Sequence, residues 1–185
     1  MGFLGLCLLF VGIALVMNGV AALSKWDAKT TAFINLVTGS ILVIGNFIGL
    51  FKADPAVIMD YNNAAGGFLF GFTYLFIAAN YLLKLDLRAF GWYSLCVTVF
   101  AVISTVVCVQ GGAVSLGVIW AAWAVLWLEG FLQLSLNLTA LGKVFPYLSI
   151  LGHFVAAFVE FVARVPPDPS PFDRESRGQV VQTEP

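Results

Sequence analysis

Residues 114–136 read VSLGVIWAAWAVLWLEGFLQLSL, an apolar run that contains one ionisable side chain, Glu129. A helix that spans a bilayer needs about 20 mostly apolar residues, and this segment is long enough. Windows of similar length and character also lie at 2–23, 30–51, 64–83, 90–109 and 144–164. The sequence therefore predicts six membrane-spanning helices.

The composition of the whole chain agrees with a membrane protein. Of the 185 residues, 61% are hydrophobic and 10% are charged, and the formal net charge is −1. A soluble domain is about 45–50% apolar and about 25% charged, and a domain of this size leaves too much surface in water to hide the excess. An ordinary soluble enzyme and a disordered chain are therefore excluded. Nine Lys and Arg against ten Asp and Glu provide no basic surface for a nucleic acid.

Short links join the predicted helices, so neighbours in the sequence should pack antiparallel. We expect an all-α integral membrane protein in which six transmembrane helices form three helical hairpins around a central pore. Residues 1–164 would form this transmembrane domain. Residues 165–185 are rich in Pro, Asp, Arg, Ser and Gln and are expected to be a disordered polar tail.

A short motif recurs after the first and the third predicted span. Residues 25–29 read KWDAK, and residues 84–88 read KLDLR. Two interpretations are open at this point. The motif can mark a repeat of helical hairpins that encloses a lumen, as in other transport folds, or it can be an interfacial turn that arises twice by chance.

The cationic residues of the links predict how the chain is oriented. Links one, three and five contain Lys25, Lys29, Lys84, Arg88 and Lys143, whereas links two and four contain only Lys52. Because short cytoplasmic loops carry an excess of Lys and Arg, we expect the odd-numbered links to face the cytoplasm. Both termini would then lie outside it.

Three tryptophans mark one face of the fifth span. At about 100° per residue, Trp120, Trp123 and Trp127 lie within roughly 60° of one another. Indoles in mid-span are unusual, because Trp normally prefers the interfacial belts. Either their flat faces and N–H donors form a slot for a planar, polar, uncharged molecule, or they simply pack against neighbouring helices.

Spans three and one have stripes that fit the slot interpretation. A wall of rings that is interrupted by a hydroxyl and an amide suits a solute that needs few hydrogen bonds. In span three this face comprises Thr73, Phe76 and Asn80, with Phe72 at its edge. Span one carries an aliphatic stripe of Leu4, Leu8, Val11 and Leu15.

No catalytic set, cofactor motif or metal-ligand spacing is visible in the sequence, so we expect neither an enzyme nor a cofactor.

Glu129 and His153 are ionisable residues within the predicted spans. Glu129 shares a face with Gln133, roughly 150° from the tryptophan stripe. It is either a buried polar contact to another helix or subunit, or a residue that faces water. His153 is either a proton sensor or a neutral packing residue.

Several stretches together resemble the AmiS/UreI family of bacterial urea and short-chain amide channels. The matching stretches are LGL at 4–6, VGI at 11–13, NG at 18–19, GFTYL at 71–75, AAN at 78–80, WYSL at 92–95, WAAWAVLWL at 120–128, and LGK at 141–143 with Pro146. The likeness runs over nearly all of the six predicted spans.

This resemblance implies a protomer of three hairpins with both termini outside, a pore through each protomer, and a hexameric ring in the bacterial inner membrane. It also implies passive conduction of urea or short-chain amides. By resemblance the pore would be lined by Leu4, Leu8, Val11, Leu15, Phe72, Phe76, Trp120, Trp123 and Trp127. Thr73 and Asn80 would add hydrogen-bonding groups.

The chain departs from the acid-gated members of the family, which have long external loops that contain His. Its second and fourth links are short and contain no His, so it is more similar to the amide-type, ungated branch. Two other hypotheses stay open. One is a proton-gated or proton-coupled small-solute transporter that uses Glu129 or His153, and the other is a structural membrane protein without a lumen.

Overall fold

The computed structural model describes residues 3–53 and 58–152, which contain helices and no strand. The long helices in these ranges are α1 (Phe3–Ser24), α2 (Ala28–Phe51), α3 (Ile58–Leu83), α4 (Leu87–Gln110) and α5 (Val114–Leu134). A short 3₁₀ helix, η1 (Thr139–Lys143), follows α5, and residues 145–152 are again helical. The predicted all-α class is confirmed.

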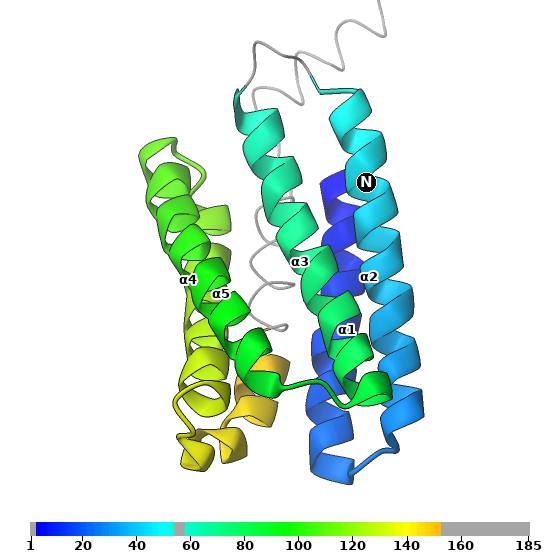
Figure 1. Cartoon of the computed structure of the whole chain (residues 1–185). Helices are drawn as coiled ribbons and strands as arrows, with labels where there is room; N and C mark the ends of the chain where they lie inside the picture. The colour runs from blue at the N-terminus through cyan, green and yellow to red at the C-terminus, as the bar shows by residue number, and fades with distance from the viewer. Residues whose placement is uncertain (1–2, 54–57, 153–185) are drawn as a thin grey trace, which may run out of the picture.

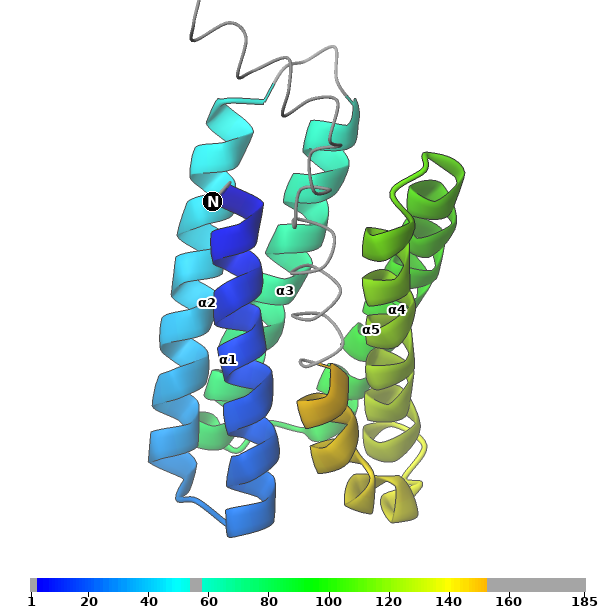
Figure 2. The same ribbon diagram turned by 180° about the vertical axis from the view of Figure 1, so that it is seen from behind.

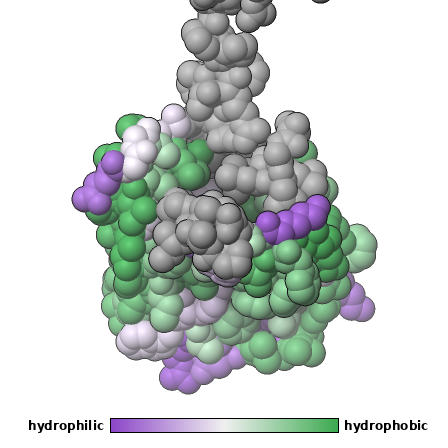
Figure 3. Space-filling view, turned by 90° about the horizontal axis from the view of Figure 1, so that it is seen from above, coloured by the Kyte–Doolittle hydropathy of each residue, from purple (hydrophilic) through white to green (hydrophobic). Residues whose placement is uncertain are grey.

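Four helices within the described residues are long and apolar enough to cross a membrane: α2, Ala64–Leu83 of α3, α4 and α5. Residues Leu9–Ser24 of α1 form a shorter apolar helix. Seen from above, the surface around the bundle is mostly hydrophobic (Figure 3). The predicted sixth span at 144–164 starts as a helix, but its later residues, His153 and the tail at 165–185 lie outside the described residues.

The long helices run up and down in one bundle (Figure 1). Helix α2 packs along α3, α4 packs along α5, and α1 packs on α2. The view from behind shows residues 145–152, in orange, between α1 and α5 (Figure 2). The buried core lies where α1, α3 and α5 face one another, and α4 closes one side of it.

The repeated motif forms the same turn twice. Lys25 and Lys84, which follow α1 and α3, both have a φ of 53°. Two residues later an aspartate caps the next helix: Asp27 accepts from the Thr30 N–H and Asp86 from the Arg88 N–H, both at 2.9 Å. The hydrogen bond from the Thr30 side chain lowers the pKa of Asp27, and the hydrogen bond from the Arg88 side chain lowers the pKa of Asp86 to about 2.

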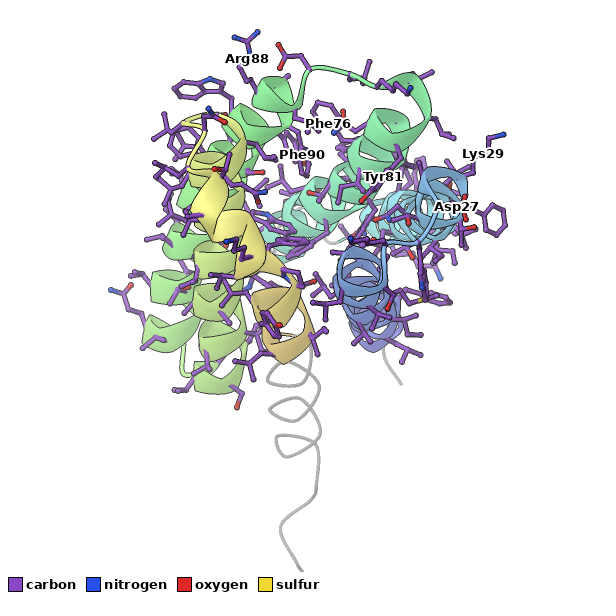
Figure 4. The ribbon with its side chains drawn as sticks, turned by 90° about the horizontal axis from the view of Figure 1, so that it is seen from below. Asp27, Lys29, Phe76, Tyr81, Arg88 and Phe90 are labelled. Carbon is purple, nitrogen blue, oxygen red and sulfur yellow. The ribbon has the colours of Figure 1, made fainter. Side chains whose placement is uncertain are left out.

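These turns and η1 lie at the same end of the bundle, which we call the charged end (Figure 1). It carries Lys25, Lys29, Lys84, Arg88 and Lys143. The view onto this end shows Lys29 and Arg88 at the periphery, pointing away from the bundle (Figure 4). Matching backbone turns at matching places favour a repeated hairpin over a chance motif.

Glycines let α2 and α3 approach closely. A Cβ at Gly71 would lie 2.7 Å from Val43 Cγ2 and 3.2 Å from the Val43 backbone N, and one at Gly39 would lie 2.9 Å from the Gly71 carbonyl O. Within membranes, where water does not drive helices together, such small residues permit the backbone contact that stabilises a helix pair.

Replacing Gly71 by valine should therefore destabilise the folded protein by about 2 kcal/mol or more, because the added atoms overlap with the α2 backbone. The unfolding temperature of the purified protein in detergent, followed by far-ultraviolet circular dichroism, measures this change. Ala65→Val, at an exposed position of the same helix, is the matched control. Equal unfolding temperatures for the two variants would contradict the assigned close contact.

Candidate functional site

Two adjoining cavities lie between the helices of the bundle. The larger has a volume of about 520 Å³ and the smaller one of about 50 Å³. Both are lined by Asn18, Ile77, Phe90, Gly130 and Phe145. Because they share these walls, the two cavities adjoin each other, and together they give a space with a wide part and a narrow part.

The space follows the long axis of the bundle. Helices α1, α3 and α5 all run toward the charged end (Figures 1 and 2). The larger cavity is lined by residues late in these helices, Ala22, Asn80 and Gln133. The smaller cavity is lined by earlier residues, Leu15, Thr73 and Trp127. The wide part therefore lies near the charged end, and the narrow part lies about one to two helical turns deeper.

The wide part has a mixed wall. Lys84 and Tyr81 line it together with side-chain amides. The Asn80 Oδ1 atom is buried and has no hydrogen-bond partner among the described residues. Viewed from the charged end, Phe76 and Phe90 lie side by side between α3 and α4 (Figure 4), with ring centroids 5.2 Å apart. Phe90 borders both cavities, and Phe76 packs against it.

An aromatic cluster lies at the narrow end of the space. The three tryptophans are at most 8% exposed, and the Phe70 ring packs among them at centroid distances of 5.7 Å from Trp120, 4.3 Å from Trp123 and 5.4 Å from Trp127. Trp127 lines the smaller cavity. The indole N–H groups of Trp123 and Trp127 are buried without a partner in the described part of the chain. Trp127 thus brings an unpartnered hydrogen-bond donor to the wall of the narrow part, and Trp123 holds a second one within the aromatic cluster.

Helix α1 forms the opposite wall. Val11 and Leu15 are 3% and 4% exposed. The Tyr74 hydroxyl donates to the Val11 carbonyl at 3.2 Å, and the Ser149 hydroxyl donates to the Leu15 carbonyl at 2.8 Å. Leu15, Tyr74 and Ser149 all border the smaller cavity, so these bonds hold its walls together. The side chains of Leu4 and Leu8 lie outside the described residues.

The remaining predicted residues differ in their placement. Thr73 lines the smaller cavity, and its hydroxyl donates to the Leu69 carbonyl at 2.9 Å, which leaves its oxygen free to accept. Phe72 is 47% exposed and stacks on Phe68. The structure therefore does not bring Phe72 to this cavity. Phe72 comes two residues after Phe70, and two residues along a helix turn a side chain by about 200°, so the two rings point to different faces of α3. Phe70 takes the place beside the tryptophans.

Some residues of the site were not predicted from the sequence, although the sequence contained a signal for one of them. Phe70 precedes Thr73 by three residues and lies on the same helical face. Phe90 and Phe145 sit at the starts of predicted spans, where no periodic stripe distinguishes a cavity wall from ordinary packing. Asn35 hydrogen-bonds Asn18 across the first hairpin, and that partnership depends on the register between two helices.

Glu129 lies apart from the aromatic cluster. It is 5% exposed, and both carboxylate oxygens are buried with no partner among the residues that the structure describes. A single chain buries this side chain, so a neighbouring subunit is not needed to cover it. The lining of the two cavities does not include it, which agrees with the predicted separation of Glu129 from the tryptophan stripe.

An all-helical bundle with apolar flanks and an axial space lined by aromatic and amide side chains defines a membrane transport protein. The chain belongs to the AmiS/UreI family: the sequence model of this family, described as AmiS/UreI family transporter, matches residues 3–160. The family membership that the motifs predicted is confirmed.

Relatives of two kinds are similar to the chain. The acid-activated urea channel of Helicobacter pylori (strain ATCC 700392 / 26695) is 33% identical, in an alignment that covers 84% of this chain and 94% of the relative. A putative amidate substrates transporter protein of Mycolicibacterium smegmatis is 32% identical over 158 residues, which cover 84% of this chain and 73% of the relative. These nearly equal identities do not favour either solute.

The fold is similar to that of a solved channel. The cryoEM structure of the Helicobacter pylori urea channel in its closed state matches with a TM-score of 0.77 and 34% sequence identity, over 86% of this chain and 96% of the other. A crystal structure of the urea channel from the same organism matches with a TM-score of 0.75.

Proposed function

We propose that the chain is a passive channel for urea or small aliphatic amides in the bacterial inner membrane, and that the solute crosses through the axial space of each protomer. The carrying observation is the Trp127 indole in the wall of the narrow cavity, which adjoins the wide one. The N–H of Trp127 is buried without a partner in the described chain, as is the N–H of the nearby Trp123. The urea channel and the amidate transporter among the relatives support this choice of solute.

The chemistry of the walls suits a small uncharged solute. A urea-sized molecule that leaves water loses hydrogen bonds, and each one left unmade costs about 1–3 kcal/mol. The indole donors, the Thr73 oxygen and the Asn80 oxygen replace part of this loss. Ions are excluded because the walls cannot compensate for the loss of a full hydration shell. Few polar anchors keep binding weak enough for release.

The proposed path comprises Val11, Leu15, Trp123, Trp127 and Thr73 in its narrow part and Asn80 in its wide part, with Trp120 and Phe76 supporting the wall. The family resemblance adds Leu4 and Leu8, which come earlier in α1, toward the other end of the bundle. The charged end faces the cytoplasm, because it gathers the cationic residues of the short links.

We propose the same architecture for the assembled protein that the family resemblance implies. The transmembrane domain forms three hairpins around the pore, with both termini outside the cytoplasm. Six protomers form a ring in the lipid bilayer. The two equivalent turns at Asp27 and Asp86 support the hairpin repeat.

Stopped-flow light scattering of proteoliposomes tests the proposed function. Vesicles that contain the chain should equilibrate an inward gradient of urea or acetamide several-fold faster than protein-free vesicles of the same lipid. The rates at pH 5 and pH 7 should agree within about twofold, because the short links contain no His that could act as a sensor. Equal rates with and without protein would favour a structural role, and a sharp rise at low pH would favour proton gating.

The Glu129→Gln variant should conduct urea at nearly the wild-type rate. The substitution keeps the size of the side chain and removes its ability to ionise, and Glu129 lies away from the proposed path. The same proteoliposome assay measures the rate, and size-exclusion chromatography shows that the variant is assembled. Abolished flux in an assembled variant would instead support a proton-coupled mechanism through Glu129.

A further inference from the structure

Three helices each contribute one side-chain carboxamide to the larger cavity. Asn18 comes from α1, Asn80 from α3 and Gln133 from α5, and all three line the space of about 520 Å³ near the charged end. We call these residues the carboxamide set. Asn80 and Gln133 line only the wide part, so a solute on the proposed path meets them separately from the indoles, whereas Asn18 lies where the wide and narrow parts adjoin.

Asn18 is held in a defined orientation. Its amide N donates to the Asn35 oxygen at 2.9 Å, and the Asn35 amide N donates back at 2.7 Å. Asn35 is fully buried and also donates to the Thr31 carbonyl at 2.8 Å. Since a carboxamide has two N–H donors and an oxygen with two lone pairs, this pairing leaves Asn18 with one donor and one acceptor position at the cavity.

The other two amides are also available at the cavity. The Asn80 Oδ1 atom is buried without a partner among the described residues. Gln133 lies against Gly142, where a Cβ would be 2.5 Å from Nε2. The absence of a side chain at Gly142 therefore gives the Gln133 amide room at the cavity wall.

We propose that the carboxamide set recognises the amide group of the solute, so that the wide cavity selects for amide chemistry while the aromatic cluster selects for size and shape. This inference rests on the proposed channel function. Urea and primary amides present N–H donors and a carbonyl acceptor side by side. They can form with a carboxamide the same paired hydrogen bonds that Asn18 forms with Asn35. A glycol has no such fixed pair.

The test compares urea flux with ethylene glycol flux in proteoliposomes. Asn80→Leu and Gln133→Met remove the amides and keep the approximate size of the side chains. Each variant should lower the ratio of urea flux to ethylene glycol flux about fivefold, the effect of one lost hydrogen bond. Gln110→Met is the control: it is the same Gln-to-Met substitution at an exposed residue, at the end of α4 that lies away from the charged end. It should leave the ratio unchanged.

The possible outcomes separate this inference from the proposed function. If both variants keep fast urea flux and an unchanged ratio of urea flux to ethylene glycol flux, the role of the carboxamide set is overturned. The proposed channel function is not affected by that result. No acceleration of either solute by the wild-type chain would overturn both. Circular dichroism and size-exclusion chromatography identify a variant that does not fold, and the other variant then decides the outcome.

Discussion

Replacing Trp127 by phenylalanine is expected to slow the flux of urea and of acetamide about tenfold. The substitution keeps an aromatic ring at the narrow cavity but removes an indole N–H that is buried without a partner in the described chain. A solute that passes this point then lacks one hydrogen bond while it is out of water, which costs about 1–3 kcal/mol. A penalty of about 1.4 kcal/mol at the highest barrier corresponds to a factor of ten in rate.

Trp92→Phe provides the matched control, because Trp92 is 57% exposed on α4 and packs against Phe131. Its flux should equal that of the wild type when both are measured by stopped-flow light scattering at equal protein-to-lipid ratios. If Trp127→Phe conducts as fast as Trp92→Phe, the indole N–H of Trp127 has no role in conduction.

Replacing Phe70 by leucine should widen the range of solutes that pass. The Phe70 ring packs against all three tryptophans at centroid distances of 4.3 to 5.7 Å. Removing it opens space beside Trp127, which lines the narrow cavity. Butyramide flux should rise several-fold relative to urea flux. A large-to-small substitution in a packed core also destabilises the protein, so thermal unfolding is measured on the same preparation.

Phe72→Leu is the informative comparison for this prediction. The family resemblance nominates Phe72 for the pore wall, whereas the structure places its ring on the outer face of α3 against Phe68. We therefore expect unchanged selectivity in Phe72→Leu. A change of selectivity in Phe72→Leu, with none in Phe70→Leu, would show that the residues of α3 are assigned to the wrong faces.

Much of the fold was accessible from the sequence because local rules determine it. Long apolar windows predict α2, α4 and α5 to within a few residues, since a bilayer demands that length of helix. The tryptophan stripe followed from helical periodicity alone, and the structure buries all three rings on one side of α5. The two Lys-x-Asp turns were visible as a repeat, although only their backbone angles show that they are equivalent.

The parts that the sequence did not predict depend on how helices meet. Periodicity assigns Phe70 and Phe72 to different faces of α3, but it does not say which face meets α5. The pairing of Asn18 with Asn35 requires the register between α1 and α2. The shared cavity of Asn18, Asn80 and Gln133 requires the positions of three separate helices. Such relations arise from packing over long sequence distances, which no local pattern encodes.

The central claim is that a solute-accessible passage runs through a single chain beside Trp127. Cysteine accessibility tests it most directly, with Gly130→Cys placed in a protein whose Cys7, Cys96 and Cys108 are replaced by alanine. Gly130 lines both cavities, and an added Cβ would meet nothing closer than the Ser94 Oγ at 3.4 Å. Val125→Cys, 56% exposed on the outside of α5, is the matched control.

A thiol reacts as the thiolate, which forms in water and not in lipid. The account predicts that a small water-soluble methanethiosulfonate modifies the thiol at position 130, that this modification blocks urea flux, and that the thiol at position 125 stays unmodified. A thiol at position 130 that is as inert as the one at 125, or that reacts while urea flux continues unchanged, would contradict a passage at this place.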